Sequence, residues 1–183
     1  MKLKLAAAVV TVCAAALAVA GCGREQQANN QQPAAQGASA DAGGMTPAAD
    51  LSPEANTKFL ADSAKRPGVT SRRSGLQYRV IKAGTGKTPT EADQVTVTYK
   101  GSLITGQVFD QTDPGQTATF PAGQLIPGWV EALQLMKEGD EWELVIPSNL
   151  AYGEQGAGGV IPPNQTLVFQ MALMKVEPLA PPP

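Results

Sequence analysis

Histidine is absent from the 183 residues of this chain, and only two cysteines occur. Without an imidazole the chain has no histidine general base, no cysteine–histidine pair and no histidine-containing zinc site, so these classes are excluded. Clusters of lysine and arginine are also missing, and the formal net charge is −2. Because a protein that binds DNA or RNA needs a positive surface for the phosphates, we expect no nucleic-acid partner.

The N-terminal residues have the pattern of an exported protein. Met1–Lys4 is a short positive segment, and residues 5–20 are apolar and rich in alanine, which is typical of a signal peptide. The small residues before Cys22 resemble the lipobox of bacterial lipoproteins, in which this cysteine is lipidated and begins the mature chain. We therefore predict a lipoprotein signal peptide over residues 1–21 and a lipid anchor on Cys22. The alternative is an ordinary secretory signal cut near Ala20, with an incidental thiol.

The same junction predicts where the mature protein resides. Cys13 lies inside the predicted signal, so the mature chain would keep Cys22 alone and form no intramolecular disulfide. An aspartate at position 23 would resemble an inner-membrane retention signal, whereas Gly23 favours the outer membrane. We expect an outer-membrane lipoprotein of a bacterial cell envelope that faces the periplasm or the surface.

Residues 22–51 are predicted to form a disordered tether. The stretch from Arg24 to Asp50 is rich in Gln, Asn, Ala, Gly and Ser and cannot bury enough apolar surface to offset the entropy of ordering. A flexible chain of this length spans about 30 Å on average. We expect the segment before Ser52 to be dispensable for folding and catalysis, so that a truncation at Ser52 keeps the same melting temperature.

A short helix is predicted over residues 52–66. Ser52 suits the N-cap, and Pro53 suits the first helical position, where a missing N–H leaves no bond unmade. Its thin apolar face consists of Phe59, Leu60 and Ala64. Such a helix is either a surface element without function or a small packing or self-association element.

Residues 67–178 are predicted to form the folded domain, and residues 179–183 a proline-rich tail. Several segments alternate between apolar and polar side chains, the pattern of strands with one buried face. The predicted strands cover residues 76–81, 94–100, 108–110, 117–120, 141–146 and 164–176. Together with glycine turns and one helix, they predict an α+β fold in which a twisted antiparallel sheet wraps around that short helix.

The helix inside this sheet is predicted to begin at Pro127 and Gly128 and to end shortly after Met136. Its apolar residues recur at the i, i+3, i+4, i+7 spacing and share one face: Trp129, Ala132, Leu133 and Met136. A helix this short is not stable in water by itself. We therefore expect its apolar face to lie on the sheet.

Acidic residues gather directly after this helix. The run consists of Glu138, Asp140, Glu141 and Glu143, and it overlaps the predicted strand 141–146. Charged side chains are rarely buried without partners. We therefore interpret the run as a solvated strand edge.

Five motifs occur in order along the domain. They are VTVTYKGSL at residues 95–103, GQVFD at 106–110, IPGW at 126–129, LAYG at 150–153 and IPPNQTLVF at 161–169. In this order they resemble the FK506-binding (FKBP) family of peptidyl-prolyl isomerases, and the similarity extends over about residues 75–176, with the motifs inside 93–178. Residues 74–78 and Trp142 are most similar to the bacterial macrophage-infectivity-potentiator and periplasmic branch, whose members often have a long helical dimerisation region before the domain.

The resemblance implies a proline-binding pocket between the sheet and the helix. The implied lining consists of Tyr99, Phe109, Trp129, Tyr152, Ile161 and Phe169, with Leu125 and Ile126 at the lip. Trp129 would be the floor beneath the proline ring, while the Ile126 N–H and the Tyr152 hydroxyl would hold substrate carbonyls. Asp110 would be the one carboxylate in the pocket, so the implied catalytic residues are Asp110, Tyr152 and Trp129. Taken singly, each aromatic residue is equally compatible with plain core packing.

The implied reaction is rotation about an X–Pro peptide bond in exported or envelope proteins, which needs no nucleophile, metal or cofactor. The implied partners are proline-containing chains and macrolides of the FK506 and rapamycin type. A non-catalytic chaperone or peptide-binding lipoprotein would use the same pocket, and a structural lipoprotein would only dock a partner. Ala118 and Ala157 stand where relatives have larger residues, which concerns peptide preference more than the reaction.

Overall fold

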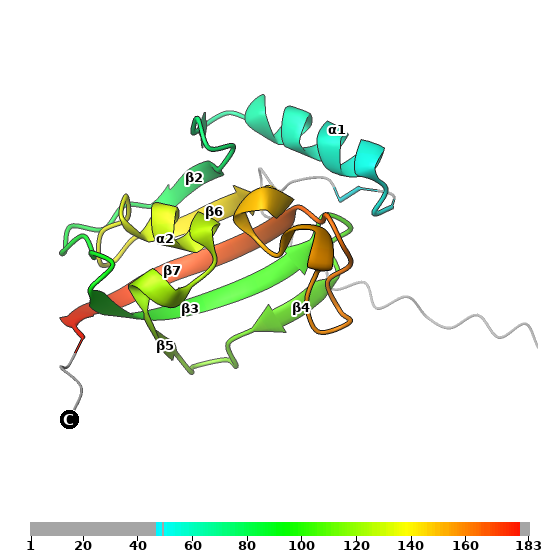
Figure 1. Cartoon of the computed structure of the whole chain (residues 1–183). Helices are drawn as coiled ribbons and strands as arrows, with labels where there is room; N and C mark the ends of the chain where they lie inside the picture. The colour runs from blue at the N-terminus through cyan, green and yellow to red at the C-terminus, as the bar shows by residue number, and fades with distance from the viewer. Residues whose placement is uncertain (1–46, 49, 180–183) are drawn as a thin grey trace, which may run out of the picture. The chain divides into compact units, whose positions relative to one another are not determined.

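The computed structural model describes residues 47–48 and 50–179 (Figure 1). The predicted signal peptide, Cys22, most of the predicted tether and the last residues of the tail lie outside the described residues. In the part of the chain that the structure describes, no helix has both the length and the apolar character needed to cross a membrane.

A twisted antiparallel sheet of seven strands forms the body of the domain (Figure 1). The strands run in the order β1-β2-β6-β7-β3-β4, and β5 also pairs with β3. Their bounds are β1 Val69–Ser71, β2 Gln77–Lys82, β3 Asp93–Leu103, β4 Val108–Gln111, β5 Ala118–Pro121, β6 Glu141–Ile146 and β7 Leu167–Pro178. Every pairing between these strands is antiparallel, so the predicted α+β class and sheet type are confirmed.

One face of the sheet, called the inner face here, packs on helix α2, Pro127–Leu133. The predicted apolar face of this helix is confirmed, because Trp129, Ala132, Leu133 and Met136 are all buried in one core cluster with Val95, Val97, Leu144, Leu167 and Met171. The α-helix ends at Leu133 rather than near Met136. A tighter turn follows, in which the Leu135 N–H donates to the Ala132 carbonyl at 2.9 Å, and this turn keeps Met136 on the buried face.

Close approach between α2 and β6 depends on Gly128. A Cβ atom at this position would collide with the side chain of Ile146 and lie 3.2 Å from the carbonyl oxygen of Leu150. Glycine lets the first turn of the helix approach the strand directly. The position of Trp129, the next residue, follows from this contact.

Helix α1, Pro53–Ala64, covers part of the opposite face of the sheet, called the outer face here (Figure 1). Its start is capped as predicted, since the Ser52 hydroxyl accepts the Ala55 N–H at 3.1 Å. Phe59 is buried against Ile104 and Val145 in a second apolar cluster. The helix is therefore a packing element of its own domain.

The residues directly before α1 also belong to the folded domain, which differs from the tether predicted up to residue 51. The Ala48 N–H donates to the Ile104 carbonyl at 2.8 Å, and Leu51 packs against both apolar clusters. A truncation at Ser52 would remove these contacts. The predicted extent of the tether is therefore wrong at Ala48 and Leu51, while the dispensability of the segment before Ser52 stays a prediction.

Other strand predictions fail where tertiary contacts override the local pattern. The side chain of Val80 is exposed, whereas Gln77 is buried and its amide donates to the Leu60 carbonyl at 3.0 Å. A register shift near the end of β2 breaks the expected alternation. At the other end of the domain β7 begins at Leu167 instead of residue 164, because Asn164 has a left-handed backbone with φ of 61°.

The acidic run is not a solvated edge. Strand β6 lies between β2 and β7, and both Asp140 and Glu143 are buried. The Glu143 carboxylate lies 2.5 Å from the Arg66 guanidinium and 3.4 Å from that of Arg79. Asp140 accepts the Lys137 N–H at 2.6 Å and also that of Gly84. Each buried carboxylate is thus paired, as its desolvation requires.

Candidate active site

An aromatic cluster centred on Trp129 lies between the sheet and α2. The side chain of Trp129 is 5% exposed, and its ring centroid lies 5.2 Å from those of Tyr99 and Phe169, with interplanar angles of 81° and 84°. Phe109 meets Phe169 edge-on at 5.6 Å. Edge-to-face contacts stabilise aromatic pairs beyond the area that they bury. The structure therefore brings together four of the aromatic residues that the family resemblance assigned to the pocket.

Phe120 is a further member of this cluster that sequence reasoning did not assign to the site. Its ring centroid lies 6.4 Å from that of Trp129 and 6.3 Å from that of Tyr99. Pairing of β5 with β3 brings it there, since Phe120 is the Cα partner of Val95. The available signal was an aromatic residue in the predicted strand 117–120, but its neighbours depend on which strands pair.

Space for the rings of Phe109 and Phe169 comes from Gly101 on β3. A Cβ atom at this position would lie 2.7 Å from the Phe109 Cζ and 2.7 Å from the Phe169 Cε1. These distances are shorter than van der Waals contact, so any larger residue would displace the rings. Gly101 therefore helps to define the shape of the aromatic surface.

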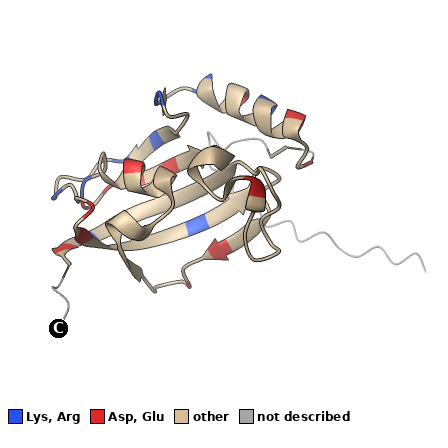
Figure 2. Ribbon diagram, in the orientation of Figure 1, with Lys and Arg blue, Asp and Glu red and all other residues tan. Residues whose placement is uncertain are grey.

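Asp110 on β4 places one carboxylate beside the aromatic cluster. Its side chain is exposed, and its Oδ2 accepts a hydrogen bond from the Tyr99 hydroxyl at 2.6 Å. Figure 2 shows the acidic colour on β4, the strand at one edge of the sheet. A hydroxyl bonded to an ionised carboxylate is a strong and directional interaction. It links the carboxylate to the ring that contacts Trp129.

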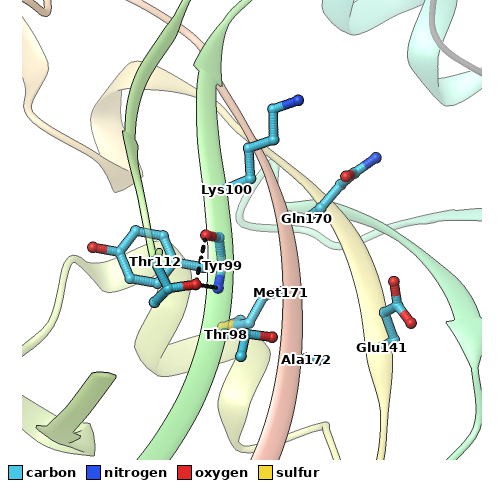
Figure 3. A pocket seen from close by; sticks show the side chains of 8 residues that line it. All are labelled: Thr98, Tyr99, Lys100, Thr112, Glu141, Gln170, Met171 and Ala172. Atoms are coloured by element: carbon cyan, nitrogen blue, oxygen red, sulfur yellow. Dashed lines mark hydrogen bonds between the residues drawn. The ribbon is translucent and has the colours of Figure 1, made fainter. Parts of the chain in front are cut away.

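Thr112, the residue directly after β4, holds the backbone of Tyr99 on β3. Its N–H donates to the Tyr99 carbonyl at 2.9 Å. Its hydroxyl accepts the Tyr99 N–H at 3.2 Å and donates to the Tyr99 carbonyl at 3.3 Å (Figure 3). These bonds take the place of a strand ladder at this point. Tyr99 is therefore held at its backbone by Thr112 and at its phenol by Asp110.

The electrostatic environment of Tyr99 favours the neutral phenol. Burial of the side chain, followed by its hydrogen bond to the Asp110 carboxylate, raises the pKa of Tyr99 well above its ordinary value. Tyr152 contributes to the same upward shift in pKa. The phenol of Tyr99 thus remains a hydrogen-bond donor throughout the physiological pH range.

This raised pKa predicts a loss of stability in alkali. A folded state that holds the Tyr99 proton more tightly than the unfolded state is stabilised below the unfolded pKa of about 10. As the pH rises above that value, the unfolded chain releases the proton first and this stabilisation is lost. We expect the stability difference between wild type and Tyr99→Phe to be constant from neutral pH to about 9 and to shrink at higher pH. Urea titrations at a series of pH values measure it, and parallel curves for the two proteins would contradict it.

The remaining residues assigned by resemblance lie around this cluster in different environments. Ile161 is buried in the inner core, and Leu125 and Ile126 are partly buried against it. The side chain of Tyr152 is 40% exposed. Among the described residues, neither the Tyr152 hydroxyl nor the Ile126 N–H has a hydrogen-bond partner. Both groups are therefore available to a ligand.

A separate shallow hollow of about 220 Å³ lies on the outer face of the sheet (Figure 3). Its walls include Thr98, Lys100, Glu141 and Gln170. Thr98 and Lys100 alternate along β3 with Val97, which is buried in the inner core, and with Gly101, which faces the rings of Phe109 and Phe169. Tyr99 and Thr112 line the hollow as well, so it adjoins the strand segment that carries Tyr99 of the aromatic cluster.

Comparison with known proteins agrees with this arrangement. Residues 85–174 match the family of FKBP-type peptidyl-prolyl cis-trans isomerases, and residues 7–80 match the domain amino terminal to such isomerases. An outer membrane protein MIP of Legionella longbeachae is 50% identical over 123 residues, which are 67% of this chain and 53% of the relative. The FKBP-type 22 kDa peptidyl-prolyl cis-trans isomerase of Escherichia coli K12 is 52% identical over 120 residues, which are 65% of this chain and 58% of that protein.

A solved structure extends the comparison to three dimensions. The crystal structure of a peptidyl-prolyl cis-trans isomerase from Pseudomonas syringae pv. tomato DC3000 superposes with a TM-score of 0.64 and 40% identity, over 68% of this chain and 92% of that one. The fold and the site together define an α+β domain with an aromatic surface beside one carboxylate. The chain belongs to the FKBP-type peptidyl-prolyl cis-trans isomerase family. It spans about half the length of the curated relatives described above.

Proposed function

We propose that this protein is a peptidyl-prolyl cis-trans isomerase that accelerates rotation about X–Pro bonds in exported or envelope proteins. The observation that supports it most directly is the surface formed by Trp129, Tyr99 and Phe169, with the Asp110 carboxylate at its side. Family membership points to the same reaction. The uncatalysed rotation takes tens to hundreds of seconds, which is slow enough to limit folding. An enzyme that accelerates this rotation would therefore accelerate folding.

In this mechanism the site binds the twisted amide better than either planar form. A planar amide separates charge between its oxygen and nitrogen by resonance, and twisting the C–N bond breaks that resonance. The apolar surface around Trp129 therefore disfavours the more dipolar planar amide relative to the twisted one. Stronger binding of the transition state than of the ground state is sufficient for catalysis. No covalent intermediate, metal or cofactor takes part.

Each residue then has a defined role in this proposal. Trp129 forms the platform beneath the proline ring, while Phe109, Ile161 and Phe169 form the apolar walls. The unpaired Ile126 N–H and Tyr152 hydroxyl hold substrate carbonyls, since both are donors without partners among the described residues. Asp110 stabilises the twisted amide electrostatically, and Tyr99 orients its carboxylate.

A non-catalytic peptide-binding chaperone is the second candidate, and a turnover assay separates the two functions. We expect the purified full-length protein in detergent to accelerate cis–trans exchange of a Leu-Pro or Phe-Pro peptide and to be inhibited by FK506, which would compete for the surface around Trp129. Binding of the peptide without acceleration would favour the chaperone. Absence of both would contradict the proposed site altogether.

We also propose that the protein is anchored by a lipid on Cys22 and resides at the outer membrane. The junction before Cys22 supports this, and so does the similarity to a relative named as an outer membrane protein. Cys22→Ser is expected to move the protein from the membrane fraction to the soluble periplasmic fraction. Mass spectrometry of the mature N terminus provides the direct test, and an unmodified Ala, Gly or Cys there would contradict the anchor.

A further inference from the structure

Three buried polar residues connect the start of α1 to the loop that precedes β7. Asn56 lies in the first turns of α1, and Gln165 and Thr166 lie directly before Leu167, the first residue of β7. All three are buried although they are polar. A buried amide that lacks hydrogen-bond partners is strongly destabilising, so the partners of these side chains reveal what they do.

The hydrogen bonds between these residues form one connected network. Asn56 Oδ1 accepts the Thr166 N–H at 2.8 Å, and Asn56 Nδ2 donates to Gln165 Oε1 at 3.1 Å. Gln165 Nε2 donates to the carbonyls of Leu51 at 3.2 Å and Pro163 at 3.0 Å. Both amide side chains thus join the N-terminal segment to the end of the loop 153–166, more than one hundred residues away in sequence.

This loop adjoins one residue of the candidate active site and carries another. Tyr152 directly precedes it, and Ile161 within it is buried in the inner core cluster. The loop is closed on itself, because the Asn164 N–H donates to the Gly153 carbonyl at 2.7 Å. Ile161 is held inside it by reciprocal bonds with Ala157 of 2.9 and 3.0 Å. Because the loop is closed on itself, we expect it to move together with its C-terminal end. That end, Gln165 and Thr166, is hydrogen-bonded to Asn56 and to the Leu51 carbonyl.

We propose that Asn56 and Gln165 are positioning residues for the active site. They fasten the C-terminal end of the loop 153–166 to α1 and thereby hold Tyr152 and Ile161 beside the aromatic cluster. Neither side chain hydrogen-bonds to a residue of the aromatic cluster, so we expect them to act through the loop backbone. The kinetic consequence rests on the proposed isomerase function, whereas the effect on the loop does not.

Helix α1 also makes an apolar contact with the sheet. Phe59 is buried against Ile104 and Val145, and its side chain takes no part in the hydrogen bonds of Asn56 and Gln165. A change at Phe59 therefore provides a matched control. Phe59→Leu weakens the apolar contact of α1 but leaves the amide network intact, while Asn56→Ala and Gln165→Ala each remove the bond between the two amides but leave Phe59 in place.

The test measures amide hydrogen exchange and catalysis in the full-length protein. The reporters are the amides of Ala157, Ile161 and Asn164, which are bonded within the loop and make no bond to Asn56 or Gln165. We expect Asn56→Ala and Gln165→Ala to speed exchange at these three amides by about threefold to tenfold and to lower kcat/KM by a similar factor. Phe59→Leu should lower the melting temperature and leave both readouts unchanged under native conditions.

Two outcomes would overturn the inference. The first is unchanged exchange at the three amides in a folded Asn56→Ala or Gln165→Ala protein. The second is an equal increase in exchange for Phe59→Leu, which would show that α1 acts only through global stability. If Asn56→Ala does not fold, Gln165→Ala decides the matter, because Asn56 then still accepts the Thr166 N–H. A wild-type protein without isomerase activity would refute the proposed function, while the exchange result would still decide whether α1 positions the loop.

Discussion

Replacing Trp129 with alanine is expected to leave the protein largely unfolded. The side chain is almost fully buried and contacts the rings of Tyr99, Phe120 and Phe169. Truncating a buried large aromatic residue to alanine costs about 3–5 kcal/mol. That approaches the stability of a small domain, which is about 5–15 kcal/mol. Thermal melts followed by circular dichroism measure the effect, and a stable, cooperative Trp129→Ala protein would contradict it.

A conservative change at the same position separates packing from catalysis. Trp129→Leu should fold, bind proline peptides and keep part of the activity, because the reaction requires an apolar surface and no chemistry of the indole. The matched control is Trp142→Leu. Trp142 is also buried on the inner face, but it stacks on Tyr78 at 4.3 Å, outside the aromatic cluster. Trp142→Leu should lose comparable stability with unchanged kcat/KM, and an equal loss of activity in both variants would assign the effect to stability alone.

Asp110→Val is expected to lower kcat/KM on a Leu-Pro or Phe-Pro peptide by about ten- to a hundredfold, or roughly 1.4–2.7 kcal/mol of barrier. The physical reason is the loss of electrostatic selection of the twisted amide. The variant should stay folded, because the side chain is exposed and its one described bond, from the Tyr99 hydroxyl, contributes only about 0.5–1.5 kcal/mol. Activity should not disappear, since no proton transfer or covalent bond depends on the carboxylate.

Two controls show what the carboxylate does. Asp113→Val removes an exposed carboxylate from the following loop and should leave kcat/KM unchanged. Tyr99→Phe keeps the Asp110 carboxylate but removes the hydroxyl that orients it, so an intermediate loss of activity is expected. A folded Asp110→Val protein without any activity would indicate a chemical role for the carboxylate. Full activity would instead assign catalysis to the apolar surface and the backbone donor.

Local sequence patterns were sufficient to predict the buried faces of α2 and β3. The spacing of Trp129, Ala132, Leu133 and Met136 predicted the buried face of α2, and alternation predicted that Val95 and Val97 are buried on β3. These predictions succeed because helical and strand periodicity is a property of consecutive residues. The order of the five motifs indicated the family, and its aromatic site residues were implied by that resemblance.

Failures occurred where burial depends on a distant partner. Glu143 has the pattern of an exposed strand residue, yet it is buried because Arg66 and Arg79 arrive from other elements and pair with its carboxylate. Leu51 lies at the end of a polar, low-complexity stretch, yet it packs on the domain because the sheet offers an apolar surface there. The type of a single residue, charged or apolar, does not predict which distant residue it will contact in the fold.

The fold class, the buried faces of α2 and β3, and the residue types available to the site can be read from the order and spacing of the residues. Strand pairing is visible only in three dimensions, and with it the contacts of Phe120 with Trp129, of Tyr99 with Asp110 and of Asn56 with Gln165. This division arises because periodicity records contacts between near neighbours in the chain. Contacts between residues far apart in sequence depend on how all the apolar faces are buried together.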